Sequence, residues 1–260
     1  MSQKPVVLCF SGHDPSGGAG IQADIETIIS HQCHCASVIT ALTEQDSRNV
    51  KKLIPQRPED IIQQAETVLA DFSVSAFKIG LIGHHDTAKA IQQILLQYPR
   101  IPVVLDPVLA AGGGTALGNQ QLLDAINQLL LPLTTILTPN SEEARRLAQC
   151  DDLVEAGWAL QAKGADYVLI TGTHEVSDLV NNQLFMPEQK TETFHWQRLP
   201  ASYHGSGCTL ASAIAALLAQ GLDPFTAVAE AQEFTWQSLA EAYQPGQGQH
   251  NPNRLFWVES

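Results

Sequence analysis

Short runs of apolar residues alternate along the chain with longer stretches in which apolar positions recur at the helical period. The apolar runs predict strands at residues 5–12, 36–45, 49–55, 74–83, 101–108, 134–140 and 166–172. The amphipathic stretches predict helices at residues 18–32, 58–71, 86–98, 119–130, 141–149, 152–163, 207–220 and 224–243. Strands separated by helices at this spacing form a mostly parallel sheet with helices on both faces, so the sequence predicts an α/β fold.

Residues 175–198 depart from this alternation. Strand-like pieces are separated there by Asn181-Asn182 and by Pro187-Glu188, which predicts short antiparallel strands at an edge of the sheet. The sequence has no internal repeat, linker or low-complexity tract, so we expect residues 1–260 to form a single domain. Ligands of such sheets bind beyond the carboxyl ends of the strands, and motifs at the strand–helix turns are therefore the candidates for function.

The charge and cysteine content argue against some classes of function. Among the 260 residues, 14 are Lys or Arg and 27 are Asp or Glu, which gives a net charge of −13. Such a chain is unsuited to nucleic acid, whose phosphates need a basic face, and it must hold an anionic ligand with local dipoles or a metal ion. The five cysteines are irregularly spaced, and we find neither a secretory leader nor an apolar membrane span. We therefore expect a cytoplasmic protein with reduced thiols.

The first glycine-rich motif is GHDPSGGAGIQAD at residues 12–24. Residues 18–23 match the dinucleotide-binding fingerprint, with Glu44 as a possible ribose acceptor, which raises the hypothesis of an NAD-dependent oxidoreductase. In that fingerprint the strand turns directly into the helix, whereas several polar residues intervene here. The longer loop favours a small substrate resting over a helix N-terminus, and a purely structural loop is the alternative.

The second glycine-rich motif, at residues 205–209, contains Gly205, Ser206, Gly207 and Cys208. Small residues at a helix start leave backbone N–H groups free, and the helix dipole adds positive potential, so the motif predicts an anion site. A thiol in that position is expected to have a lowered pKa. Cys208 could serve as a nucleophile, as a general base or as a small core residue, and the neighbouring His204 lies on the far side of the loop.

Three further patterns are ambiguous. Asn140 and Glu143 have the spacing of a helix capping box, which on sequence grounds is favoured over a functional role. Asp106, followed by proline, could be a turn former or a functional carboxylate. The sequence HQCHC at residues 31–35 matches no zinc-site spacing, and the phosphate-binding pattern of P-loop nucleotidases is missing.

Taken in order, GHDPSGGAGIQAD, SVITALTEQ, KIGLIG, LDPVL, TPNSEEA and HGSGCT resemble the hydroxymethylpyrimidine/phosphomethylpyrimidine kinases of thiamine biosynthesis. These enzymes belong to the ribokinase-like superfamily, so the resemblance implies a three-layer sandwich with a small antiparallel edge. It also implies ATP-dependent phosphorylation of 4-amino-5-hydroxymethyl-2-methylpyrimidine and then of its monophosphate. ATP, Mg²⁺ and a homodimer follow from the same resemblance.

The resemblance assigns roles residue by residue. Cys208 matches the base that takes the substrate's hydroxyl proton, and the amides at Gly205, Ser206 and Gly207 match the anion hole. The residues implied to contact the pyrimidine are Gln45, Asp24, Gly12, Gly18, Gly20, Leu81 and Val108. Those implied to contact ATP are Asp106, Asn140, Thr171 and Gly172, and Glu143 is implied to place Mg²⁺, usually through water.

The chain departs from the family in two places near the expected phosphate contacts, and it also has Leu81 where many relatives have Met, a swap that conserves side-chain volume. Residues 110–114 read Ala-Ala-Gly-Gly-Gly, where many relatives have Lys or Thr followed by Ser-Gly-Asp. Residues 171–174 read Thr-Gly-Thr-His, where relatives often have Lys-Gly-Gly-His, so we expect that a phosphate-contacting lysine is missing. The alternatives are a pyridoxal kinase of the same superfamily, the NAD-dependent oxidoreductase and a non-catalytic pyrimidine sensor.

Overall fold

The computed structural model describes residues 4–111, 113–115 and 117–258, and its strands form a single sheet. The strands are β1 (Val6–His13), β2 (His34–Gln45), β3 (Val50–Pro55), β4 (Val74–Ile79), β5 (Val103–Leu105), β6 (Ile136–Leu137), β7 (Tyr167–Ile170), β8 (Leu179–Met186) and β9 (Lys190–Gln197). The sheet order is β3-β2-β1-β4-β5-β6-β7-β8-β9. Neighbours from β2 to β7 pair in parallel, whereas β3, β8 and β9 pair antiparallel at the two edges.

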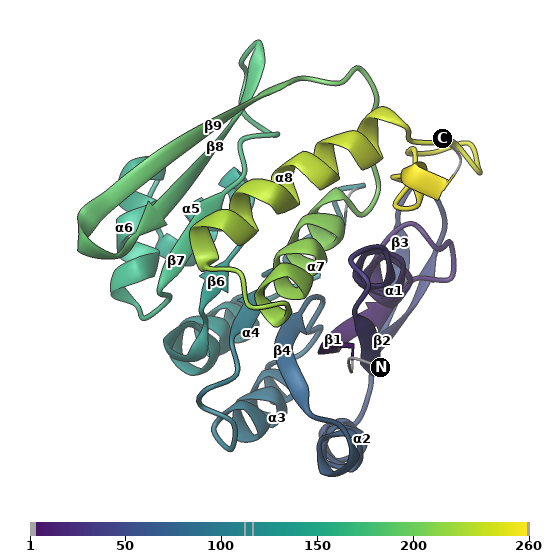
Figure 1. Cartoon of the computed structure of the whole chain (residues 1–260), viewed down its shortest axis with the longest axis vertical. Helices are drawn as coiled ribbons and strands as arrows, with labels where there is room; N and C mark the ends of the chain where they lie inside the picture. The colour runs from purple at the N-terminus through teal and green to yellow at the C-terminus, as the bar shows by residue number, and fades with distance from the viewer. Residues whose placement is uncertain (1–3, 112, 116, 259–260) are drawn as a thin grey trace.

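Helices cover both faces of the sheet and complete the predicted three-layer sandwich (Figure 1). They are α1 (Gly20–Ser30), α2 (Pro58–Asp71), α3 (His85–Leu95), α4 (Gln120–Ala125), α5 (Ser141–Ala148), α6 (Leu153–Ala162), α7 (Ser206–Ala219) and α8 (Pro224–Ala240). A π-helical turn at Ile126–Leu130 and short 3-10 turns at Leu131–Leu133, Pro187–Gln189 and Phe256–Val258 follow some of these elements. Helices α1, α7 and α8 lie on one face, and α2 to α6 lie on the other.

Two hydrophobic cores lie on the two faces of the sheet, and strand β1 contributes to both. Leu8 and Phe10 point into the core beneath α2 to α6, while Val7 and Cys9 point into the core beneath α1 and α7. Successive side chains of a strand alternate between faces, so a strand covered on both sides is apolar at nearly every position. This burial explains why the central strands appear as uninterrupted apolar runs in the sequence.

One predicted turn is absent. The turn expected at Asn181-Asn182 lies inside β8, whereas the turn expected at Pro187-Glu188 is present. The side chain of Asn182 is buried, where its Nδ2 donates to Gln232 Oε1 of α8 at 2.8 Å and its Oδ1 accepts from the amide of Gly172 at 3.0 Å. Asparagine is a common turn residue, but here its hydrogen bonds are satisfied by groups distant in the sequence.

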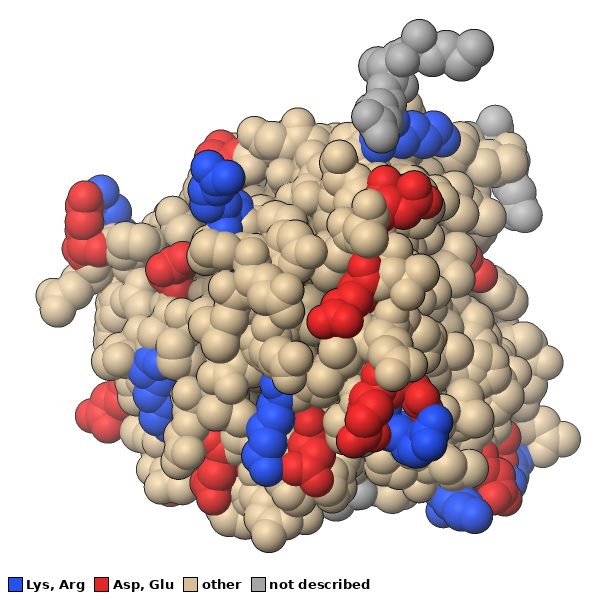
Figure 2. Space-filling view, turned by 90° about the horizontal axis from the view of Figure 1, so that it is seen from below, with Lys and Arg blue, Asp and Glu red and all other residues tan. Residues whose placement is uncertain are grey.

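Charges on the surface are mixed in sign. On the face shown in Figure 2, acidic and basic side chains are interspersed, with no broad basic area. None of the helices in the described part of the chain is long and apolar enough to cross a membrane.

A buried ion pair joins helix α1 to strand β4. Lys78 of β4 lies 2.8 Å from Asp24 of α1, and both side chains have no exposed surface. The Asp24 carboxylate also accepts from Ser11 at 2.5 Å and from Ser212 at 2.7 Å. Burial by itself lowers the pKa of Lys78, but the Asp24 carboxylate raises it, so the ammonium group stays charged.

Removing one member of this pair leaves the other charge buried without a partner. We expect Lys78→Met to lower the free energy of unfolding by about 3–5 kcal/mol. The double variant Lys78→Met/Asp24→Asn should recover much of this loss, because a neutral amide can still be hydrogen-bonded by the two serines. Urea denaturation of the three proteins measures the effect, and a single variant within about 1 kcal/mol of the original chain would contradict it.

Candidate active site

A cavity of about 660 Å³ opens beyond the carboxyl ends of the parallel strands. The chain reaches it at the end of each of these strands, through His13 at the end of β1, Gln45 at the end of β2, Leu81 after β4, Asp106 after β5, Thr138 after β6 and Thr171 after β7. The N-termini of α1 and α7 complete its wall. The position is the one expected for ligands of a doubly wound sheet.

Most of the residues singled out from the sequence meet around this cavity. Those that line it are Gly12, Gly20, Gln45, Leu81, Asp106, Val108, Asn140, Glu143, Thr171, Gly205, Ser206, Gly207 and Cys208. Three others lie elsewhere. Gly172 borders a separate cavity of about 360 Å³, Gly18 packs beneath His204 and Asn251, and Asp24 is enclosed by its ion pair with Lys78.

The two glycine-rich loops touch each other through their backbones. Gly205 has a positive φ of 84°, and a Cβ atom there would lie 2.0 Å from the carbonyl oxygen of Gly18. Gly20 has a φ of 60°, and its Cβ would lie 2.3 Å from the carbonyl oxygen of Gly12. Only glycine fits these approaches. The first brings the starts of α1 and α7 together, and the second closes the first loop onto itself.

Helix α7 begins at Ser206 with its first amides facing the cavity. Its N-cap is Gly205, which has no side chain to accept a hydrogen bond from these amides. Free N–H groups and the positive end of the dipole make the start of α7 suitable for a phosphate. The anion site expected from the sequence stays a prediction, which this geometry allows.

Two buried carboxylates face the start of α7. Glu143 closes the predicted capping box with Asn140, and its Oε1 also accepts from the amide of Leu109 at 3.1 Å. Burial and the nearby charge of Asp106 raise the pKa of Glu143 to about 8. Burial likewise raises the pKa of Asp106 to about 6, and its Oδ2 atom is buried without a hydrogen-bond partner. Two carboxylates with one oxygen unsatisfied suit a divalent cation such as Mg²⁺.

Comparison with known proteins agrees with this architecture. Residues 14–253 match the family model described as phosphomethylpyrimidine kinase. A hydroxymethylpyrimidine/phosphomethylpyrimidine kinase of Haemophilus influenzae is 35% identical over 269 residues, which cover 100% of this chain and 99% of that protein. The chain belongs to the phosphomethylpyrimidine kinase family.

Solved structures show the same fold. The ADP complex of Bacillus subtilis pyridoxal kinase has a TM-score of 0.88 and 28% identity, and the match covers 97% of this chain and 99% of that one. The phosphomethylpyrimidine kinase of Clostridium difficile has a TM-score of 0.80 and 29% identity, with 91% and 100% covered. The expected ribokinase-like fold is thereby confirmed for this member of the family.

The structure corrects two expectations for the family residues. The pKa of Cys208 is not lowered but raised to about 12, because burial outweighs the nearby Lys78 ammonium and the carboxylates of Asp106 and Asp24 oppose ionisation. Asp24 was expected to accept from the amine of the pyrimidine, but its oxygens bind Lys78 and two serines and it does not line the cavity.

The dinucleotide fingerprint also finds no support in the geometry. Glu44, the expected ribose acceptor, is exposed and lies outside the cavity lining. The polar loop from Asp14 to Ala19 separates the end of β1 from the start of α1, so the strand does not turn directly into the helix as a dinucleotide site requires.

The phosphate-binding lysine missing from the sequence is not supplied from elsewhere in the described lining. Arg198 is the only Lys or Arg among the described residues around the cavity. Its guanidinium donates to the backbone carbonyls of Thr173, Glu175 and Ser177 at 2.9–3.0 Å. Gly112, which belongs to the other departure from the family, lies outside the described residues.

Sequence reasoning missed one residue of the cavity lining and two buried residues that support it. His204 was set aside, yet its Nε2 atom lies 2.8 Å from Asp14 and 2.7 Å from the amide of Gln45. Lys78 could have been found from the sequence, because a lone lysine in an apolar strand indicates a buried partner of opposite charge. Nothing in the sequence pointed to Arg254, because it lies in the polar tail. In the structure it is only 2% exposed and donates to the Gly18 carbonyl at 2.5 Å.

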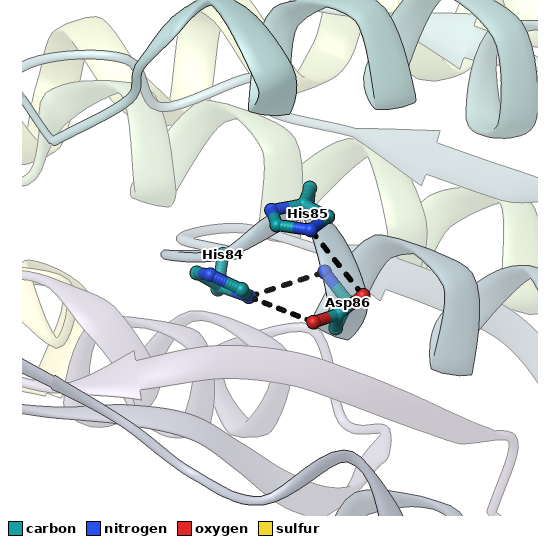
Figure 3. A group of neighbouring side chains, drawn as sticks. All are labelled: His84, His85 and Asp86. Carbon is teal, nitrogen blue, oxygen red and sulfur yellow. Dashed lines mark hydrogen bonds and ion pairs between the residues drawn. The ribbon is translucent and has the colours of Figure 1, made fainter.

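A cluster of potential metal ligands lies at the start of α3, outside this cavity. His84 and His85 both face the carboxylate of Asp86, at 3.5 Å and 3.4 Å (Figure 3). Asp86 is also paired with Lys89 at 2.8 Å, and His84 Nδ1 accepts from the Asp86 amide as the helix cap. These contacts give the cluster a structural role in starting α3.

The contact between the loops predicts an asymmetric response to alanine. Gly205→Ala should lower the free energy of unfolding by more than about 2 kcal/mol, because it combines a positive φ with a backbone clash. Gly207→Ala is the matched control: its Cβ would lie 3.7 Å from Asp106, an ordinary contact, so we expect stability within about 1 kcal/mol of the original chain. Equal losses for both variants in urea denaturation would refute this interpretation of the loops.

The buried carboxylates predict a pH dependence of stability. Because the folded chain keeps the Glu143 proton up to about pH 8 while the unfolded chain releases it near pH 4.5, stability is lost as the pH rises through this window. Glu143→Gln removes this dependence. The Tm of the variant minus the Tm of the original chain should therefore increase by several degrees between pH 5 and pH 8. Thermal unfolding in EDTA measures the difference.

The exposed neighbour Glu142 provides the control for this experiment, because it lies on the same helix turn but in solvent. Glu142→Gln should keep a constant Tm difference from the original chain across the same pH range. A constant difference for Glu143→Gln as well would show that Glu143 does not hold its proton in the folded state.

Proposed function

We propose that this protein uses MgATP to phosphorylate 4-amino-5-hydroxymethyl-2-methylpyrimidine and then its monophosphate, giving the pyrophosphate used in thiamine synthesis. The observation that carries the proposal is the single cavity in which the uncapped start of α7 and Cys208 face Asp106 and Glu143. Family membership and the names of the relatives support it. A homodimer and a cytoplasmic location remain proposals based on the family resemblance.

The start of α7 and the two carboxylates divide the work of phosphoryl transfer. The amides at Gly205, Ser206 and Gly207 would hold the phosphoryl group in line and stabilise the charge on its oxygens. Glu143 would place Mg²⁺, which would supply positive charge beside the phosphates of ATP, while Asp106 stays available as a proton acceptor. A metal ion would supply the positive charge that no lysine supplies in the described lining of the cavity.

Cys208 would receive the proton of the substrate hydroxyl. A thiol with a pKa near 12 is a poor base alone, but the Asp106 carboxylate lies close enough to influence its ionisation and could take a proton from it. As the hydroxyl oxygen forms its bond to the γ-phosphorus and the bond to ADP breaks, the hydroxyl proton passes to the sulfur and the thiol proton passes to the Asp106 carboxylate. The second reaction needs no such transfer, since a phosphate monoester is already ionised at neutral pH.

This difference gives a specific test. We expect Cys208→Ala to slow phosphorylation of the hydroxymethylpyrimidine by about 10²–10⁴-fold and phosphorylation of its monophosphate by less than about tenfold. Mass spectrometry of the products, with each substrate supplied separately, measures both rates. Cys150→Ala, which removes a thiol outside the cavity, should leave both rates unchanged. Equal losses in the two steps would show that Cys208 is not the proton acceptor.

The same assay tests the second candidate, a pyridoxal kinase. The observation that favours it is the similarity to the Bacillus subtilis pyridoxal kinase over nearly the whole chain. Pyridoxal phosphate as the sole product would transfer the assignment to that activity. Binding of the pyrimidine without consumption of ATP would support a non-catalytic sensor.

A further inference from the structure

Gln45, the residue proposed to contact the pyrimidine, is held by neighbours that determine which way its amide faces. The atom placed as Oε1 of its amide lies 3.1 Å from the hydroxyl oxygen of Thr43, and the atom placed as Nε2 lies 2.7 Å from Nε2 of His204. The same Nε2 atom lies 2.8 Å from Oδ2 of Asp14. Because the oxygen and the NH₂ group of an amide have nearly the same shape, the donors and acceptors around it decide their assignment.

The side facing Thr43 must be the NH₂ group. Thr43 Oγ1 carries one proton and lies 2.9 Å from the backbone carbonyl of His13, which can only accept. The Thr43 proton is therefore directed to that carbonyl, and the hydroxyl oxygen is left as an acceptor toward Gln45. Only the NH₂ end of the amide can donate to it.

The side facing His204 must be the oxygen. Asp14 is an acceptor whose oxygens also bind the amides of Ser16 at 2.8 Å and Ala19 at 2.9 Å. Although burial raises it, the pKa of Asp14 is held below its usual value by hydrogen bonds from His204 and Ser16. A bare nitrogen facing this carboxylate at 2.8 Å would be repelled, so Nε2 of His204 carries a proton and shares it with Asp14 and Gln45.

We infer that the Gln45 amide directs its oxygen to His204 and its NH₂ group to Thr43, and that His204, held by Asp14, is a positioning residue that sets the orientation of the pyrimidine. The inference about the substrate rests on the proposed function; the orientation of the amide does not. His204 and Asp14 are both buried, with 8% and 3% of their surface exposed, so water does not compete for the hydrogen bond between them.

The orientation of the amide decides where the reacting group lies. An aminopyrimidine presents a ring nitrogen that accepts next to an amine that donates, and the free N–H and lone pair of Gln45 complement this edge in one sense only. Reversing the amide would turn the ring over and move the hydroxymethyl group from one side of the amine to the other. A fixed amide therefore holds the hydroxymethyl group on one side of the amine, so that a single orientation of the ring is presented to the phosphoryl donor.

Comparing two substrates in His204 variants tests this role. The substrates are the hydroxymethylpyrimidine and its analogue without the 4-amino group, and the readout is the ratio of their kcat/KM values. We expect a ratio of about tenfold in the original chain, falling to about twofold in His204→Phe, which loses the N–H donor. His204→Gln keeps an N–H near the same position and should keep most of the ratio. A purely structural role would lower both kcat/KM values and leave the ratio unchanged, which would overturn the inference.

Neutron diffraction from crystals of the original chain tests the amide separately. Deuterium on the side of Gln45 that faces Thr43 supports the assignment, and deuterium on the side that faces His204 overturns it. This measurement needs neither a folded variant nor a substrate. If the original chain phosphorylates neither pyrimidine, the proposed function fails, and the neutron result still decides the orientation of Gln45.

Discussion

The contact between the carbonyl of Gly18 and the backbone of Gly205 is the constraint on which the site depends. It brings the N-termini of α1 and α7 to the same end of the sheet, where both point at one cavity. Arg254 stabilises the contact, because its guanidinium donates hydrogen bonds both to the Gly18 carbonyl and to the Thr209 hydroxyl oxygen. A segment far away in the sequence thus stabilises an approach that glycine permits but cannot hold by itself.

Charge is distributed unevenly around this contact. Lys78 neutralises Asp24 in the layer behind the cavity, while Asp106 and Glu143 face the cavity with raised pKa values. Burying carboxylates without an equal number of cations costs stability, which a protein tolerates where a ligand supplies the missing charge. The local charge balance, rather than the net charge of −13, is therefore what suits the site to a metal–nucleotide complex.

Much of the fold could be predicted from the sequence, because the central strands are buried on both faces and alternate with amphipathic helices. Local patterns misled where a distant partner decides the outcome. Asn181-Asn182 resembles a turn until α8 supplies a partner for Asn182, and Cys208 at a helix start suggests a low pKa until burial between carboxylates is counted. Asp24 of α1 follows the family motif, but its carboxylate is paired with Lys78 of β4. Spacing identifies which residues belong to the site, whereas burial decides what each of them contacts.

The choice between pyrimidine and pyridoxal cannot come from the fold, which enzymes acting on either substrate share. It must come from the edge of the ring that the protein reads. Pyridoxal has no amine next to a ring nitrogen, so an amide held with one N–H and one lone pair toward the cavity discriminates by hydrogen-bond pattern instead of size. The alcohol and its monophosphate have the same ring edge and differ only at the reacting end. If Gln45 recognises the ring and Cys208 takes the proton, as proposed, recognition and proton transfer are separate, and one cavity can accept both substrates in turn.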